Sequence, residues 1–151
     1  MEEDEYRSAY HALNQRRCVF EKTVLSRRAA CTHAQRFCLA DREGVTCLDE
    51  AALAQCKTLL DAMRDKASFA LKQTRIDGPL PHAKEIKVQT GGLLGIQAQL
   101  GSTVAHAEGQ IADIASLVDQ ALARFGGLQA LPYTEITRSI VLFAGRKRGN
   151  D

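Results

Sequence analysis

Apolar residues recur at helical spacing between positions 49 and 73, and no other pattern in the sequence constrains the fold as strongly. Steps of three and four residues place side chains on one face of an α-helix. Thr46 or Asp49 can cap the start of the helix, and the turn-forming segment 76–81 follows its end. The apolar stripe comprises Leu53, Cys56, Leu60, Met63, Ala67 and Ala70. The segment predicts an amphipathic helix whose apolar face packs against the remainder of the chain.

Helical patterns also precede and follow this segment. Residues 6–39 contain neither glycine nor proline, and their apolar spacing predicts one or two helices, with a loop at 41–46 after them. Residues 111–125 predict an amphipathic helix that Gly126-Gly127 ends. Pro132 marks the start of a last helix, which carries Ile136, Ile140 and Phe143 on its apolar face.

Residues 82–101 fit two structures. The stretch 85–89 alternates like a strand and 90–92 could turn a hairpin. A helix would instead place Gly91 and Gly95 one turn apart, leaving a notch where another backbone or a bulky group could approach. We favour the helix because a lone hairpin has no sheet to join. The expected fold is therefore all-α, a bundle of five or six helices in a single domain over residues 1–151. The alternative is an α+β fold with one short hairpin around residues 84–100.

Length and composition indicate a small cytoplasmic protein. A chain of 151 residues can bury a core without covalent staples, so its cysteines are not needed for folding. The acidic start 1–5 has no apolar leader after it, and no stretch is long and apolar enough to span a membrane. Five cysteines are an odd number, which together with a reducing cytoplasm favours thiols over a disulfide framework.

All five cysteines lie in the first 56 residues, and we treat residues 18–56 as a cysteine-bearing subregion. Between Arg16 and Glu43 the chain has seven Arg or Lys residues and three acids, an excess of four positive charges. Nearby cations favour the thiolate, which is the form that ligates metals. The subregion therefore predicts metal or redox chemistry.

Spacing decides which cysteines can share one ligand. On an unbroken helix Cys31 and Cys38 would stand about 10.5 Å apart along the axis, too far for one zinc ion. Cys38 lies between Phe37 and Leu39 and is expected to be a small core residue, so we exclude it.

The remaining four cysteines are the predicted ligands: Cys18, Cys31, Cys47 and Cys56. Cys47 lies at or just before the start of the clear helix, where backbone N–H groups stabilise a thiolate. Cys56 lies on the stripe that faces the earlier helices. Cys18 and Cys31 would be about 220° apart around one straight helix, so they converge only if the chain bends near residues 22–26.

The ligand pattern favours an iron–sulfur cluster, specifically 4Fe-4S, over a zinc ion. Zinc modules pair their ligands two to four residues apart, and Cys31 with His33 is the sole close pair here, with no CxxC. A four-iron cluster accepts cysteines from separate segments. We expect electron transfer or redox sensing with a larger redox or regulatory partner. Zinc is the runner-up, and five metal-free thiols are the remaining possibility.

Other functions have weaker support in the sequence. No established catalytic motif is present, and a triad of Cys47, His33 and Asp49 has no supporting spacing, so we do not expect an enzyme. A cofactor-free helical adaptor could dock on an acidic partner through its arginines and the basic tail 146–148. Nucleic acid is disfavoured by the net charge of +2 and the lack of tryptophan. A helix-turn-helix around residues 126–127 is the form that DNA binding would take.

Overall fold

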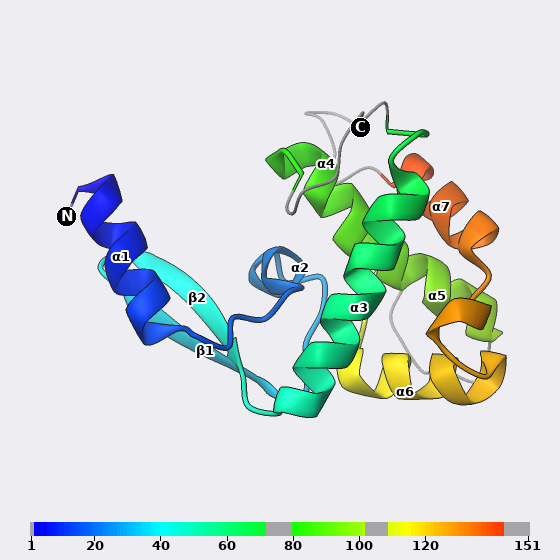
Figure 1. Ribbon diagram of the computed structural model, residues 1–151, viewed down its shortest axis with the longest axis horizontal. Helices are drawn as coiled ribbons and strands as arrows, with labels where there is room; N and C mark the ends of the chain where they lie inside the picture. The colour runs from blue at the N-terminus through cyan, green and yellow to red at the C-terminus, as the bar shows by residue number, and fades with distance from the viewer. Residues whose placement is uncertain (1, 72–79, 102–108, 144–151) are drawn as a thin grey trace.

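The structure is a computed structural model that describes residues 2–71, 80–101 and 109–143 (Figure 1). Its elements are α1 (Glu3–Leu13), α2 (Glu21–Leu25), β1 (Ala34–Leu39), β2 (Arg42–Cys47), α3 (Glu50–Ala67), α4 (His82–Ile86), the π-helical turn η1 (Lys87–Gly91), α5 (Gly92–Leu100), α6 (Ile114–Phe125), the 3-10 helix η3 (Leu128–Ala130) and α7 (Tyr133–Leu142). Within these described ranges the fold is helix-rich with one antiparallel two-stranded hairpin, so the expectation of an all-α fold is wrong.

The hairpin replaces the helix expected up to residue 39 and the loop expected at 41–46. β1 and β2 pair from Leu39↔Arg42 to Ala34↔Cys47 across a two-residue turn. The hairpin has no larger sheet to join in the described part of the chain, but α1 covers it, with the rings of Tyr10 and Phe37 5.8 Å apart. These contacts supply the burial that a lone hairpin lacks.

One short hairpin in a helix-rich chain is the α+β class given as the alternative, but the position of that hairpin around residues 84–100 is wrong, because this region is helical. α4, η1 and α5 follow one another without interruption, and the π-helical turn lies in the middle. The predicted glycine notch is present on this helix. A Cβ at Gly91 would lie 2.8 Å from Cα of Ile140, and one at Gly95 would lie 3.2 Å from Cα of Ile136. The two glycines therefore let the backbone of α7 pack closely on this face.

Gly91→Ala is expected to lower the free energy of unfolding by about 1–3 kcal/mol, because the new methyl group would overlap the backbone of α7. Gly92→Ala is the matched control, since its Cβ would meet the flexible side chain of Met63, whose Sδ lies 2.5 Å away. Both substitutions gain similar helix propensity. Urea denaturation measures the two losses, and an equal or larger loss in Gly92→Ala would contradict the close packing on α7.

Three predicted helices are confirmed, with different bounds. α3 begins as expected at the Asp49 cap, whose Oδ1 accepts a hydrogen bond of 2.9 Å from the N–H of Ala52. It ends at Ala67, before the expected residue 73, so Ala70 lies outside the helix and is exposed. α6 ends at Gly126, which adopts a left-handed conformation with φ of 90°. α7 starts directly after Pro132 and buries Ile136 and Ile140. The connection between α6 and α7 spans residues 126–132, longer than the turn of a helix-turn-helix.

The core lies among α3, α5, α6 and α7, and the hairpin with α1 extends to one side of these helices (Figure 1). Phe20, at the start of α2, is fully buried in this core and links the cysteine-bearing subregion to the helices. No helix in the described ranges combines the length and apolar character needed to cross a membrane. The predicted basic tail 146–148 and most of the predicted turn 76–81 lie outside the described residues.

Candidate functional site

Four cysteines from four separate segments line one cavity, which we call the cysteine cavity. Its lining consists of Cys18, Cys31, Cys47 and Cys56 with Val19, Phe20, His33, Ala34, Ala52, Leu53, Ile114 and Ala115. All of these residues other than His33 and the thiols are apolar. The free space is about 20 Å³, which is roughly the room that one water molecule needs.

Cys18 is brought to Cys47 by backbone pairing beside the hairpin. Residues 16–18 run along β2 as an additional, very short antiparallel segment, with a bridge between Arg17 and Thr46. The N–H of Cys18 donates to the carbonyl of Val45 at 3.0 Å, and the N–H of Cys47 donates to that of Arg16 at 2.7 Å. The positions of these two sulfurs are therefore set by main-chain hydrogen bonds.

Cys31 reaches the cavity because the chain reverses after α2. The bend that convergence requires is made at Arg27, which has a positive φ of 64°. A positive φ is uncommon for a residue other than glycine, and no glycine or proline in this segment marks the bend. The loop that follows is fastened to the start of α6, since Thr32 donates its N–H and its hydroxyl to the two carboxylate oxygens of Asp113 at 2.8 and 2.7 Å.

Cys47 and Cys56 enter the cavity from the two sides of the α3 cap. Cys47 is buried at the end of β2, and its thiol donates to the backbone carbonyl of Asp49 at 3.2 Å. The thiol does not use the imidazole of His33, which lies 4.0 Å from the Asp49 carboxylate. Cys56 projects half-buried from the second turn of α3. The cap residue Asp49 therefore fixes both the start of α3 and the hydrogen bond of the Cys47 thiol.

Cys38 is exposed on β1 and does not line the cysteine cavity. Its exclusion from the ligand set agrees with this position. The expected reason for the exclusion is wrong, because Cys38 is not a core residue. In a strand the side chains alternate between the two faces, so Cys38 points away from the side on which Phe37 meets α1.

Burial dominates the electrostatics of three of these thiols. Chiefly through burial, with a smaller contribution from neighbouring cysteines, the pKa of Cys18 is raised to about 12 and that of Cys56 to about 12. Burial also raises the pKa of Cys31, against hydrogen bonds from the backbone of His33 and Ala115. For Cys18, Cys31 and Cys56 the expectation that nearby arginines favour the thiolate is wrong, because loss of solvation outweighs the local excess of positive charge.

Many of the arginines around the subregion are bound to acidic groups. Arg17 contacts Glu21 at 2.8 Å, and Arg27 and Arg36 both contact Glu43, at 3.9 and 3.6 Å. Arg16 is 3.5 Å from Glu50. Glu21 and Glu43 are already counted in the local excess of four positive charges, so among these pairs only the contact of Arg16 with Glu50 reduces that excess.

Two larger cavities adjoin the cysteine cavity from different sides. The first has a volume of about 420 Å³ and shares Cys18, Val19 and Leu53 with the cysteine cavity. The second has a volume of about 220 Å³, contains Asp49 and Asp119, and shares Cys56 and His33 among its lining residues. The thiols are thus enclosed by the fold but lie only one layer of side chains from solvent-accessible space.

The donor set of the cysteine cavity fits an iron–sulfur cluster in its chemistry. Four thiols and apolar walls are the surroundings in which cysteine-ligated clusters are held. In the described ranges no three or more Cys, His, Asp or Glu side chains are gathered closely enough to hold a metal ion. With only about 20 Å³ free, the residues that line the cavity would have to rearrange to admit a cluster. Cys18 and Cys31 lie outside regular helices and strands, although hydrogen bonds to Val45 and to Asp113 hold the segments that contain them.

Two parts of the site were not found by sequence reasoning. Asp113 fastens the Cys31 loop, and only its position just before a helical pattern could have indicated it as a cap residue. The buried ion pair of Arg64 and Glu85 lies under the first adjoining cavity and has no signal in the spacing of residues. No protein-family model, curated protein or solved structure matches the chain.

Proposed function

We propose that this chain binds a 4Fe-4S cluster through Cys18, Cys31, Cys47 and Cys56 and acts in electron transfer or redox sensing with a larger redox or regulatory protein. The observation that carries the proposal is the lining of one cavity by four thiols from four segments, without Cys38. The four cysteines are 9 to 38 residues apart in sequence, so only the tertiary fold brings them to one cavity.

The surroundings of the thiols support a cluster more than a reactive cysteine. A nucleophilic or redox-sensing thiol is favoured by a lowered pKa and by exposure, whereas burial raises the pKa of Cys18 and Cys56. These thiols are protonated at neutral pH without metal, and ligation releases their protons. When bound, the cluster supplies a one-electron couple. The chain supplies four sulfurs, apolar walls that restrict water, and the hydrogen bond from Cys47 to Asp49.

A cofactor-free adaptor has less support. Its docking groups were expected to be arginines, and those of the subregion largely contact acids of the same chain, as Arg17 contacts Glu21. A zinc ion could use the same four ligands, but it would require all four sulfurs within about 2.3 Å of one point. A cluster accepts a wider arrangement of cysteine sulfurs than a single zinc ion does.

The test is the metal content of protein made without oxygen. We expect about four iron atoms and about four acid-labile sulfides per chain, with broad absorption near ~400 nm that bleaches on reduction. Stoichiometric zinc with no sulfide would replace the proposal with the zinc alternative. If the folded protein contains no metal and takes up neither iron with sulfide nor zinc, the cluster proposal fails and the cofactor-free adaptor is the remaining function.

A further inference from the structure

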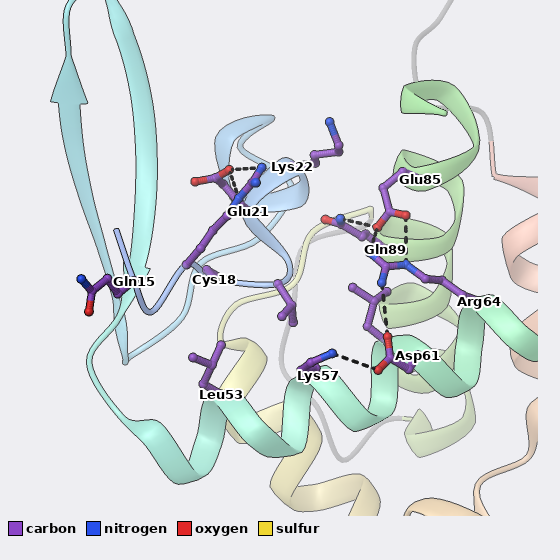
Figure 2. Close-up of a pocket in the computed structure, with 13 residues that line it drawn as sticks. Gln15, Cys18, Glu21, Lys22, Leu53, Lys57, Asp61, Arg64, Glu85 and Gln89 are labelled. Atoms are coloured by element: carbon purple, nitrogen blue, oxygen red, sulfur yellow. Dashed lines mark hydrogen bonds and ion pairs between the residues drawn. The ribbon is translucent and has the colours of Figure 1, made fainter. Parts of the chain in front are cut away.

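The cavity of about 420 Å³ beside Cys18 differs in character from the cysteine cavity, and we call it the charged cavity (Figure 2). It lies between the segment 15–22, α3 and the α4–η1 helix. Its lining consists of Gln15, Arg17, Cys18, Val19, Glu21, Lys22, Leu53, Lys57, Leu60, Asp61, Arg64, Glu85 and Gln89. This volume is within the range of small-molecule sites, which combine apolar walls with a few placed polar groups.

The floor of the charged cavity is fixed by buried hydrogen bonds. Arg64 donates to both carboxylate oxygens of Glu85, at 3.1 and 2.8 Å, and Gln89 donates to Glu85 at 2.7 Å. The π-helical turn η1 contains Gln89, whose side-chain oxygen Oε1 accepts a hydrogen bond from the backbone N–H of Thr23 at 3.3 Å. These side chains have no freedom to fill the space above them, so the cavity is preformed.

The charges of the lining leave one cation in surplus. The acids Glu21, Asp61 and Glu85 are each within ion-pair distance of a basic partner: Arg17 at 2.8 Å, Lys57 at 3.3 Å and Arg64 at 2.8 Å. The fourth cation, Lys22, contacts the Nδ1 atom of His82 at 3.0 Å and has no carboxylate partner among the described residues. A bound group with a single negative charge would balance the lining.

We propose that the charged cavity binds a small organic monocarboxylate, with the carboxylate at Lys22 and the apolar body against Val19, Leu53 and Leu60. Leu60 is fully buried and Val19 is half-buried, so the apolar part of a ligand would rest on core side chains. A carboxylate has the single charge that the lining lacks, and the apolar walls exclude a small hydrated ion as the best occupant. The binding site needs no cluster, so it stands independently of the function proposed above.

The experiment is an NMR titration of the full chain, metal-free and with its thiols reduced, using 4-phenylbutyrate as the probe. We expect saturable shifts at the backbone amides of Val19, Leu53 and Leu60, with a dissociation constant on the order of 1–5 mM for a ligand of this size. The neutral analogue 4-phenylbutyramide is expected to bind at least about fivefold more weakly, because it lacks the charge that complements Lys22.

Two lysine variants complete the test. Lys22→Gln is expected to weaken binding of 4-phenylbutyrate about fivefold. Lys66→Gln is the matched control, because Lys66 is exposed on α3 outside the cavity and contacts the ring of Tyr133. The proposal fails if no saturable shifts occur up to about 20 mM, if the amide binds as tightly as the acid, or if Lys22→Gln and Lys66→Gln bind alike.

Discussion

Arg64→Met is expected to lower the free energy of unfolding by about 3–5 kcal/mol, the largest loss of stability that we predict for a single substitution. Glu85 is 1% exposed, and its carboxylate binds Arg64 through two hydrogen bonds. Methionine has a similar length and would fill most of the volume, so the loss comes from the carboxylate and not from a cavity. Without Arg64 a charged group stays buried with no cation to compensate it.

The pH dependence separates this cause from a packing defect. Burial raises the pKa of Glu85, but the hydrogen bonds from Arg64, Gln89 and the N–H of Leu80 outweigh it, so the pKa is below its usual value. The contribution of Glu85 in the wild type is therefore present above the unfolded pKa, about 4.3, and is lost as pH falls through the lower folded pKa. In Arg64→Met the folded pKa rises, and protonation of Glu85 then relieves the uncompensated charge.

Urea denaturation at pH 7 and pH 5 measures both effects. The difference between wild type and Arg64→Met is expected to shrink at pH 5. Arg138→Met is the control, because Arg138 contacts Glu135 on an exposed face of α7 and such pairs contribute about 0–1 kcal/mol. A loss below about 1 kcal/mol for Arg64→Met, or a loss that does not change with pH, would contradict the role given to this ion pair.

The long periodic segments of the fold were predictable from the sequence. α3, α6 and α7 combine apolar stripes with residues that mark a helix end: Asp49 caps the start of α3, Gly126 follows α6 and Pro132 precedes α7. The notch at Gly91 was also predictable, because two glycines one turn apart leave space for another backbone or a bulky group; the structure shows that the backbone of α7 occupies it. The position of a helix can be predicted from sequence where capping and helix-ending residues mark its two ends.

The hairpin could not be predicted because its stability comes from outside its own residues. The spacing of Cys31, Ala34, Phe37 and Cys38 matches a helix, yet Phe37 pairs with Tyr10 of α1 and Val45 is buried in the core. Tertiary contacts of this kind override the local pattern. Gly44 lies opposite Phe37 in the register, where a Cβ would be 2.5 Å from the ring, and this constraint also becomes visible only once the strands pair.

The candidate ligand set followed from the sequence by elimination, while the geometry that unites it did not. Cys38 was excluded because helical spacing separated it from Cys31 and its apolar neighbours suggested a core position, whereas the residue is exposed on a strand. The meeting of Cys18 with Cys31 depends on the left-handed conformation of Arg27 and on the hydrogen bonds of Thr32 to Asp113. Neither the conformation of Arg27 nor the hydrogen bonds of Thr32 to Asp113 belongs to a sequence motif. Arginine, threonine and aspartate occur in many other structural settings, so these residues do not indicate the bend or the contact.

Replacing any one of the four cavity cysteines with serine is expected to reduce the iron content of anaerobically prepared protein at least about tenfold. The four variants are Cys18→Ser, Cys31→Ser, Cys47→Ser and Cys56→Ser. A serine hydroxyl is a harder and less acidic donor than a thiol, and iron–sulfur clusters select soft thiolate ligands. The matched control is Cys38→Ser, which changes an exposed thiol outside the cysteine cavity and is expected to retain full iron and sulfide.

The interpretation requires that the variants fold, which far-UV circular dichroism and urea denaturation establish. Serine in place of a half-buried thiol is expected to lower the free energy of unfolding by about 1–3 kcal/mol, because its hydroxyl is desolvated without gaining a hydrogen-bond partner. Cys56→Ala provides a second removal of the same sulfur without that polar group. If Cys56→Ser and Cys56→Ala fold and bind iron and sulfide like the wild type, Cys56 is not a ligand. If only Cys38→Ser loses iron, the cysteine cavity is not the site at all. A loss shared by the four cavity variants and absent from Cys38→Ser would assign one cluster to the one place where these four segments meet.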